Sequence, residues 1–259
     1  MKWKAIGQSV TGTSHIHSQK SCEDAVCYTS FDLSEGDEVL LCAVSDGAGS
    51  AQYAAEASSL LTTQIVRKIE SLVKVNHNIC EVDIISIAED LYNELKRIAD
   101  DRKVPLNEFS CTLLGCVLLP NKSIFFQVGD GAIIRNDGTD HYVSLWWPQN
   151  GEYQNTTYFF VDEELAHFKV MELFESIYEL AILSDGLQLL VLNLEQQSVH
   201  QPFFKNIFTP LRMADKQANL TVLDDKLYAY LNSELINSRT DDDKTLFLAT
   251  RLHNERSEI

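Results

Sequence analysis

The chain has few glycines and prolines, few basic residues and no long apolar run, and each lack argues against a class of protein. Its 259 residues include only 11 glycines and 5 prolines, with no low-complexity or linker stretch, so we expect one domain over 1–259. The 21 Lys and Arg face 38 Asp and Glu, and the net charge of −17 argues against nucleic acid or an anionic membrane as a partner. No apolar run reaches the length of a membrane span, and the N-terminus lacks the apolar core of a signal peptide, so we expect a cytoplasmic protein.

The six cysteines form no CxxC pair. Cys42 lies in an apolar run, and Cys111 and Cys116 flank or lie in another, which favours buried, reduced thiols over disulfides or a zinc site. The chain also lacks an HCxxxxxR loop and any Ser/His/Asp or Cys/His arrangement. These absences argue against a cysteine nucleophile and leave no arrangement that suggests a covalent intermediate.

What the chain does have is a carboxylate at the end of several apolar runs. Asp-Gly pairs close three runs, at Asp46, Asp130 and Asp185, and the cluster Asp241–Asp243 stands before a fourth. Each run is short and rich in β-forming residues, as expected of a buried strand, and the glycine permits a sharp turn after it. Converging carboxylates repel one another unless divalent cations neutralise them, so the pattern indicates a hard-metal site.

The hydrophobic pattern predicts groups of strands separated by pairs of helices. Strands are expected over residues 2–10, 25–32, 38–45, 110–119, 123–128, 133–136, 168–174, 177–183 and 245–251. Helices are expected over residues 51–75 (capped by Ser50), 84–100, 201–213 and 223–236. The polar, aromatic segment 146–157 is typical of a surface loop or flap. Trp146 and Trp147 either line a groove beside it or anchor it, and we expect anchoring. This order predicts an α+β fold with sheets inside and helices outside.

Two further segments carry candidate chemistry. Glu23 and Asp24 lie immediately before a predicted strand, where alone they would be ordinary surface charge. His15 and His17 are two residues apart on a segment expected to be extended, so they share one face and either contact a phosphate or pack. The turn after Asp46 is glycine-rich but lacks the lysine of a P-loop, which makes nucleotide binding a weak hypothesis.

In order and spacing, these motifs resemble the metal-dependent protein phosphatases of the type-2C family, and most closely their divergent bacterial branch. The segments that carry the resemblance are GTSH, CED, AVSDGAGS, CTLLGCVL, QVGDG, ILSDG and TDDDKTLFLA, spread over residues 12–251. The resemblance implies a four-layer α/β/β/α sandwich, with two central antiparallel sheets flanked by helix pairs. It also implies hydrolysis of phosphoserine and phosphothreonine in proteins by a metal-activated water.

The resemblance assigns a catalytic core of three aspartates. Asp46 would bridge two Mn²⁺ or Mg²⁺ ions, and the Gly47 carbonyl would bind one of them. Asp185 and Asp242 would ligate the other ion. The chemistry of phosphoryl transfer suits such a site, because it needs mainly positioning and charge compensation.

Other acidic residues take auxiliary roles by the same resemblance. Glu23 and Asp24 would hold metal-bound waters or one ion. Asp130 matches a Gly-Asp pair associated with a third, weaker metal, although Leu189 stands where many members have a second carboxylate for it. Asp243 replaces an asparagine that many members have after the last ligand.

Two positions depart from the family pattern. Gln19 stands where many relatives have an arginine that binds the substrate phosphate, and Lys20, or His15 and His17, are the expected replacements. Ala48 stands where animal-type members often have a histidine thought to act as general acid.

Three functions remain open at the level of sequence. The leading one is a cytoplasmic, Mn²⁺- or Mg²⁺-dependent phosphoprotein phosphatase, with a cognate protein kinase as a partner by resemblance. The second keeps the metal site but acts on a small phosphorylated metabolite or nucleotide. The third is a non-catalytic regulatory module, against which the retained Asp46, Asp185 and Asp242 argue, because a module without metal gains nothing from mutually repelling carboxylates.

Overall fold

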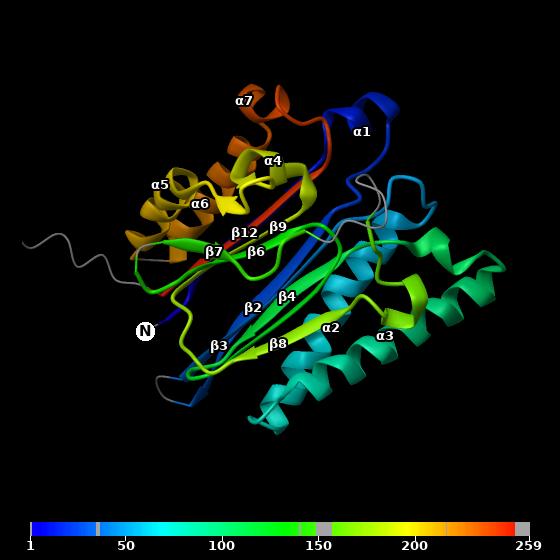
Figure 1. Ribbon diagram of the computed structural model, residues 1–259, viewed down its shortest axis with the longest axis horizontal. Coiled ribbons are helices and arrows are strands. Elements are labelled where there is room, and N and C mark those ends of the chain that lie inside the picture. Colours follow the sequence, from blue (N-terminus) through cyan, green and yellow to red (C-terminus); the bar gives the residue numbers. More distant parts are fainter. Residues whose placement is uncertain (1, 35–36, 140, 149–156, 216, 252–259) are drawn as a thin grey trace, which may run out of the picture.

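Two five-stranded antiparallel sheets lie face to face at the centre of the molecule (Figure 1). The computed structural model describes residues 2–34, 37–139, 141–148, 157–215 and 217–251. The first sheet has the order β2-β3-β4-β5-β8, formed by Ala25–Ser34, Asp37–Ser45, Leu113–Leu118, Ser123–Val128 and Lys169–Leu173. The second has the order β1-β12-β9-β6-β7, formed by Lys4–Val10, Lys244–Thr250, Glu179–Leu183, Ala132–Asn136 and Tyr142–Ser144.

Two helix pairs cover the outer faces of the sheets (Figure 1). Helices α2 (Ala54–Val75) and α3 (Glu81–Arg102) pack on the first sheet, and α5 (Gln201–Arg212) and α6 (Gln217–Leu231) pack on the second. The short elements are α1 (Thr13–Ser18), η1 (Leu106–Phe109), η2 (Asp162–Leu165), η3 (Asp185–Leu187), α4 (Gln188–Val191), β10 (Leu192–Asn193), β11 (Ser198–Val199) and α7 (Glu234–Asn237). The layers confirm the expected α/β/β/α sandwich.

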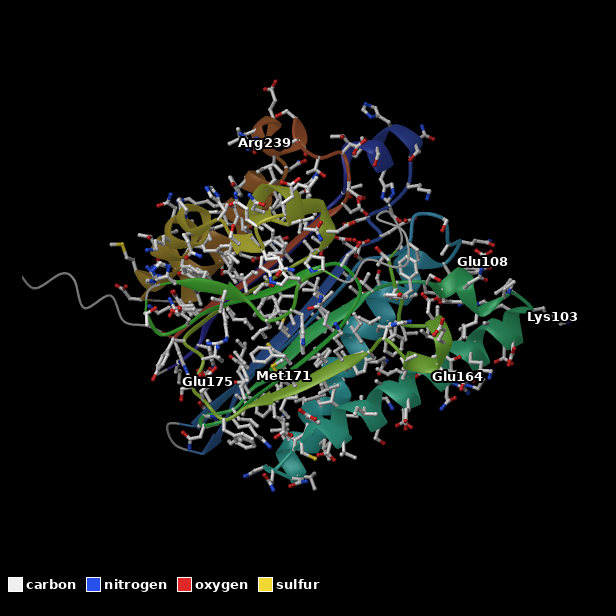
Figure 2. All side chains as sticks on the ribbon, viewed as in Figure 1. Lys103, Glu108, Glu164, Met171, Glu175 and Arg239 are labelled. Carbon is white, nitrogen blue, oxygen red and sulfur yellow. The ribbon has the colours of Figure 1, made fainter. Side chains whose placement is uncertain are left out.

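Alternate side chains of each central strand enter different cores, as the two-residue period of a strand requires. In β3, Val39, Leu41 and Ala43 pack beneath α2 and α3, whereas Leu40 and Cys42 face the other sheet. Strand β12 divides its side chains in the same way between the second helix pair and the core between the sheets. Figure 2 shows side chains filling the space between the layers. Because both faces are buried, these strands have nearly continuous apolar sequences.

Two expectations about the first half of the chain are wrong. Helix α2 begins at Ala54 instead of directly after Ser50, because turns occupy the residues between them. The segment expected to be extended around His15 and His17 is the short helix α1, whose Ser14 N–H donates to the Asp241 carbonyl at 2.9 Å. The two histidines therefore do not share a strand face, and it is a contact with a distant segment that holds this turn of helix.

The helix expected over residues 223–236 is also wrong, because two helices occupy that region. Helix α6 ends at Leu231, and α7 begins after Ser233, whose hydroxyl donates to the Tyr230 carbonyl at 2.6 Å. A serine that bonds the preceding turn in this way competes with continued helix, which accounts for the break.

The expected loop over 146–157 falls mostly outside the described residues, which omit 149–156. At its start, Trp146 packs against the core between the sheets and Trp147 against the core beneath α5 and α6, as expected of anchors. All six cysteines have free thiols. In the described part of the chain, no helix combines the length and apolar character needed to cross a bilayer.

Candidate active site

Antiparallel pairing brings the acidic residues of the sequence motifs to one end of the sandwich. Asp46 follows β3 and Asp24 precedes β2, and the register of these two paired strands places the two aspartates side by side. Asp185 follows β9, and Asp242 precedes β12. These two strands are paired with each other in the second sheet. Asp130 lies in the turn between β5 and β6.

Asp24 links the two sheets at this end and is only 7% exposed. Its Oδ2 accepts hydrogen bonds from the hydroxyls of Ser184 and Thr245, each at 2.7 Å. Burial raises the pKa of Asp24 to about 7; the two hydroxyl bonds oppose that rise, and the charges of Asp243 and Asp185 add to it. A carboxylate of this kind is costly to ionise unless a cation lies beside it.

Asp46 and Asp185 share a hydrogen bond between their carboxyl groups. Burial raises the pKa of Asp46 well above its ordinary value, and the charges of Asp24 and Asp185 raise it further. Burial also raises the pKa of Asp185 to about 6, although its hydrogen bond with Asp46 opposes the rise. Two carboxyl groups in contact retain a proton between them unless a cation takes its place.

The backbone around Asp46 is fixed by the start of β4. The Asp46 carbonyl accepts from the Thr112 N–H at 2.7 Å, and its N–H donates to the Thr112 hydroxyl at 2.9 Å. Gly47 then lets the chain pass close to its neighbours, because a Cβ there would lie 2.8 Å from the Cβ of Ala54. The Gly47 N–H donates to the Glu23 carbonyl at 3.1 Å. The turn therefore requires glycine for close approach.

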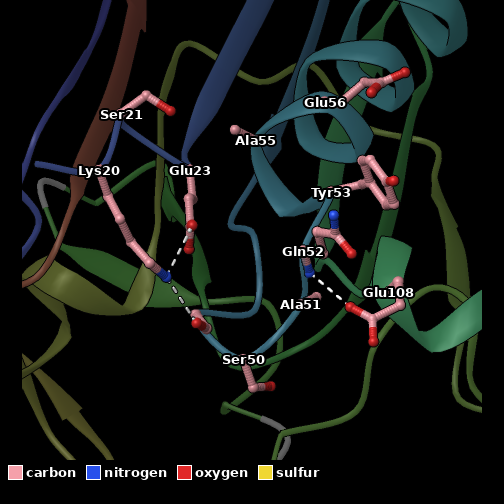
Figure 3. Close-up of a pocket in the computed structure, with 11 residues that line it drawn as sticks. Lys20, Ser21, Glu23, Ser50, Ala51, Gln52, Tyr53, Ala55, Glu56 and Glu108 are labelled. Atoms are coloured by element: carbon pink, nitrogen blue, oxygen red, sulfur yellow. Dashed lines mark hydrogen bonds and ion pairs between the residues drawn. The ribbon is translucent and has the colours of Figure 1, made fainter.

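Glu23 and Lys20 form the rim of the site nearest to α1. Glu23 is 7% exposed, and its Oε2 has no hydrogen-bond partner. Lys20 Nζ donates to Glu23 Oε1 at 3.3 Å and to the Gly49 carbonyl at 2.9 Å, as the dashed lines in Figure 3 show. The lysine thus spans from the segment before β2 to the turn after β3.

Asp243 organises this region, a role that the sequence did not reveal. It is 2% exposed; its Oδ1 accepts from the Gly12 N–H at 2.6 Å, and its Oδ2 accepts from the Glu23 N–H at 2.5 Å. His15 Nδ1 lies 2.9 Å from the same Oδ2, which places His15 Nε2 3.7 Å from Glu23 Oε2. His17, in contrast, is exposed. The only signal for Asp243 was its place directly before a strand that is buried throughout.

The remaining candidates lie at the edge of the site. Asp242 is exposed, and its Oδ1 accepts from the Asp243 N–H at 2.8 Å. Asp130 accepts a hydrogen bond from the Thr157 hydroxyl, and burial raises the pKa of Asp130. Leu189 is 80% exposed and supplies no carboxylate beside Asp130.

The chemistry of this end of the molecule fits a hard divalent cation. Three buried carboxylate oxygens have no hydrogen-bond donor: Glu23 Oε2, Asp24 Oδ1 and Asp185 Oδ1. A buried acceptor without a partner costs free energy that a bound cation relieves, and carboxylate oxygens are the ligands that such cations prefer. Within the described residues, no three His, Cys, Asp or Glu side chains are already grouped to enclose an ion, because these carboxylates pair with hydroxyls, with Lys20 and with one another.

The four-layer sandwich, with carboxylates at one end of its sheets, is the arrangement that the sequence resemblance predicts. A family model for protein phosphatase 2C matches residues 11–231. The chain belongs to this family and is an enzyme, which confirms the resemblance seen in the sequence. It is 32% identical over 257 residues to serine/threonine-protein phosphatase 3 of Escherichia coli (strain K12), covering 96% of this chain and 98% of that protein.

Two solved structures have the same fold. The serine/threonine phosphatase PstP/Ppp of Mycobacterium tuberculosis superposes with a TM-score of 0.67 at 12% identity, covering 98% of this chain and 100% of that one. The serine/threonine phosphatase Stp1 of Staphylococcus aureus superposes with a TM-score of 0.61 at 15% identity, covering 96% and 95%. At such low identity these likenesses speak for the fold alone.

Proposed function

We propose that this chain is a Mn²⁺- or Mg²⁺-dependent phosphatase that hydrolyses phosphoserine and phosphothreonine in proteins. The observation that carries the proposal is the set of three donor-free buried oxygens, on Glu23, Asp24 and Asp185, in a chain of this family. The related Escherichia coli protein is named as a serine/threonine-protein phosphatase, which favours a phosphoprotein over a small metabolite as substrate.

Asp46, Asp185 and Asp242 form the proposed catalytic core, together with the Gly47 carbonyl. Asp46, Asp185, Asp242 and the Gly47 carbonyl would hold the two ions. When bound, such ions supply a water nucleophile at neutral pH and compensate charge on the phosphoryl group. The protein holds Asp46 in place through both backbone bonds to Thr112.

Glu23 and Asp24 have a supporting role in this proposal, and Asp130 belongs to a weaker third site. Glu23 Oε2 and Asp24 Oδ1 would complete the surroundings of the ions, directly or through water. Asp24 is positioned for this by the two hydroxyls that occupy its other oxygen. Asp130 would act alone, since Leu189 offers it no second carboxylate.

Lys20 and His15 are the proposed contacts for the substrate phosphate. The Lys20 side chain is 43% exposed and places its ammonium group at the rim of the site. Asp243 fixes the His15 ring through Nδ1, so that Nε2 faces the carboxylates. Gln19, which ends α1 in a left-handed conformation, turns the chain between these two residues and offers no charge of its own.

The proposal also includes a cognate protein kinase as partner, cytoplasmic action and a single domain over 1–259. In favour of one domain, the two sheets share a continuous core, in which Leu40 and Val44 of one sheet meet Ile182 and Phe247 of the other.

The test measures hydrolysis of an aryl phosphate and of a phosphothreonine peptide, with Mn²⁺ and with EDTA. We expect both substrates to be hydrolysed with Mn²⁺ alone, and Asp46→Asn to lower kcat by roughly 10² or more, since it removes a charge that the core requires. Asp32→Asn, on an exposed residue paired with Lys2, is the matched control.

Activity that persists in EDTA or survives Asp46→Asn would contradict the metal-dependent mechanism. Cleavage of the aryl phosphate without the peptide would point to a small phosphorylated metabolite. Metal binding without any hydrolysis would leave a regulatory module.

A further inference from the structure

A hollow of about 510 Å³ lies beside the carboxylate site (Figure 3). In Figure 3, Lys20 and Glu23 line its left side, and Ser50, in the turn after β3, lies at the bottom. Tyr53 and Glu56, at the start of α2, and Glu108 of η1 line its right side. Glu23 belongs to both the hollow and the carboxylate site, so a ligand in the hollow would be a neighbour of a phosphoryl group in that site. The volume is in the range of known ligand sites.

Negative charge predominates in the hollow. Its charged lining consists of three carboxylates and one ammonium group, which are those of Glu23, Glu56, Glu108 and Lys20. Lys20 pairs with Glu23 and Arg102 pairs with Glu56, which leaves the charge of Glu108 as the part of this lining that a ligand would meet. A cationic group is therefore the ligand that this lining would attract, because buried or half-buried carboxylates are stabilised by a nearby positive charge.

Glu108 is the carboxylate that remains available to a ligand. Its Oε2 accepts from the Gln52 N–H at 2.8 Å, which fixes the side chain against the turn, and among the described residues its Oε1 makes no hydrogen bond. Glu108 also receives the Tyr53 N–H on its carbonyl at 2.9 Å, so both ends of the residue are held. A carboxylate held in this way can accept a charge-assisted bond with little loss of side-chain freedom.

Two residues of this lining, Glu56 and Tyr53, already contact a guanidinium group, that of Arg102. Arg102 donates to the two carboxylate oxygens of Glu56 at 2.8 Å and 2.5 Å, and lies 4.8 Å from the centroid of the Tyr53 ring. Both Glu56 and Tyr53 line the hollow. A carboxylate beside an aromatic ring is a favourable setting for a planar cation.

We propose that this hollow binds a lysine or arginine side chain of the phosphoprotein substrate, close in sequence to the phosphorylated residue. The inference rests on the proposed function, since the phosphoryl group must occupy the adjacent carboxylate site. Lys20 lies between the carboxylate site, which would take the phosphoryl group, and the carboxylates of the hollow, which would take the basic side chain. Its ammonium group would contact the phosphate, and Glu108 would contact the substrate cation. Phosphoproteins with a basic residue near the phosphosite are then the preferred substrates.

The test compares phosphothreonine peptides that differ only in one residue, which is Arg, Ala or Glu, moved through the three positions on each side of the phosphothreonine. With the full chain and Mn²⁺, we expect Arg at one position to raise kcat/KM over Ala by roughly five- to tenfold, and Glu there to lower it. Glu108→Gln, which keeps an oxygen for the Gln52 N–H, should abolish the Arg advantage, and Glu108→Lys should reverse it in favour of Glu. Glu70→Gln, on a half-buried residue of α2 that pairs with Lys74 and lies outside the lining of the hollow, is the control and should change neither.

Hydrolysis of the aryl phosphate distinguishes failure of this inference from failure of the proposed function. Hydrolysis of an aryl phosphate together with equal kcat/KM for all peptides would overturn the inference and leave the phosphatase intact. An Arg preference that survives both Glu108 variants would also overturn it. Loss of the preference in Glu108→Gln, with its reversal in Glu108→Lys, would establish the site, because a misfolded variant cannot gain a new preference. A chain that hydrolyses neither aryl phosphate nor peptide would overturn both.

Discussion

At the scale of the residue, Asp243 shows how one buried carboxylate can position a site without entering it. Its two oxygens receive the N–H groups of Gly12 and Glu23 and contact the His15 ring, so it ties the segment 12–23 to the start of β12, more than 200 residues further along the chain. Bonds to a charged acceptor are roughly twice as strong as those between neutral groups, which suits this role.

We therefore expect Asp243→Asn to lower the free energy of unfolding by about 1–3 kcal/mol, because an amide offers one acceptor oxygen and turns a donor toward other donors. Asp241→Asn is the matched control, since that side chain is exposed and should change stability by less than about 0.5 kcal/mol. Urea denaturation of both variants measures the difference. Equal losses in the two variants would show that Asp243 has no special role.

The raised pKa of Asp24 predicts a pH dependence of the metal-free protein. The pKa rises from 3.8 to about 7 on folding, so the folded state binds this proton more tightly than the unfolded state does. That contribution to stability is complete below pH 3.8 and is lost as the pH rises through about 7. In EDTA, we expect the wild type to lose roughly 1–4 kcal/mol more than Asp24→Asn between the two ends of this window.

Denaturation curves in EDTA at several pH values measure this difference. Saturating Mn²⁺ should remove it, because the cation takes the place of the proton. Parallel curves for the wild type and Asp24→Asn in EDTA would contradict the raised pKa.

At the scale of the element, the approach of α1 to the start of β12 depends on glycine. A Cβ at Gly12 would lie 2.3 Å from the carbonyl carbon of Asp242, and one at Gly186 would lie 2.0 Å from the carbonyl oxygen of Asp243. Three backbone segments from both halves of the chain thus meet at distances that exclude any side chain. The GTSH and SDG motifs owe their glycines to this meeting point.

Gly12→Ala should accordingly cost about 1–3 kcal/mol of stability, as overpacking does in a dense interior, and should weaken the bond from its N–H to Asp243. Gly49→Ala provides the control, because a Cβ at Gly49 would find its nearest neighbour at 3.9 Å. Thermal denaturation distinguishes the two substitutions. A tolerated Gly12→Ala would mean that this contact relaxes without cost.

At the scale of the whole molecule, the proposed site lies where both sheets end, so bound cations would tie the two halves of the sandwich together. At a Mn²⁺ concentration 100 times the dissociation constant, we expect stabilisation by about 2.7 kcal/mol, which raises Tm by roughly 5 °C or more. Differential scanning calorimetry of the wild type, Asp46→Asn and the control Asp32→Asn makes the measurement. An unchanged Tm in the wild type would argue against metal binding.

Most strands and the long helices are predictable from the sequence because their signals are local. The run Glu38–Ser45 and the periodic pattern of α2 each predict their own element, because an apolar face must be buried whichever segment covers it. The errors occur where a distant partner decides the conformation. The Ser14 N–H bond to Asp241 makes α1 helical, and neither residue signals the other in the sequence.

The sequence by itself determined that carboxylates stand at strand ends, since an Asp-Gly pair after an apolar run is visible in the order of residues. It also determined the family, because the motifs occur in one order along the chain. Only the tertiary structure decided which acidic residue is buried, which is paired and which is left without a donor. Asp242 and Asp243 are neighbours in the sequence, yet one is exposed and the other accepts bonds from Gly12 and Glu23. Burial and pairing depend on segments brought together by two sheets, and no local pattern encodes that meeting.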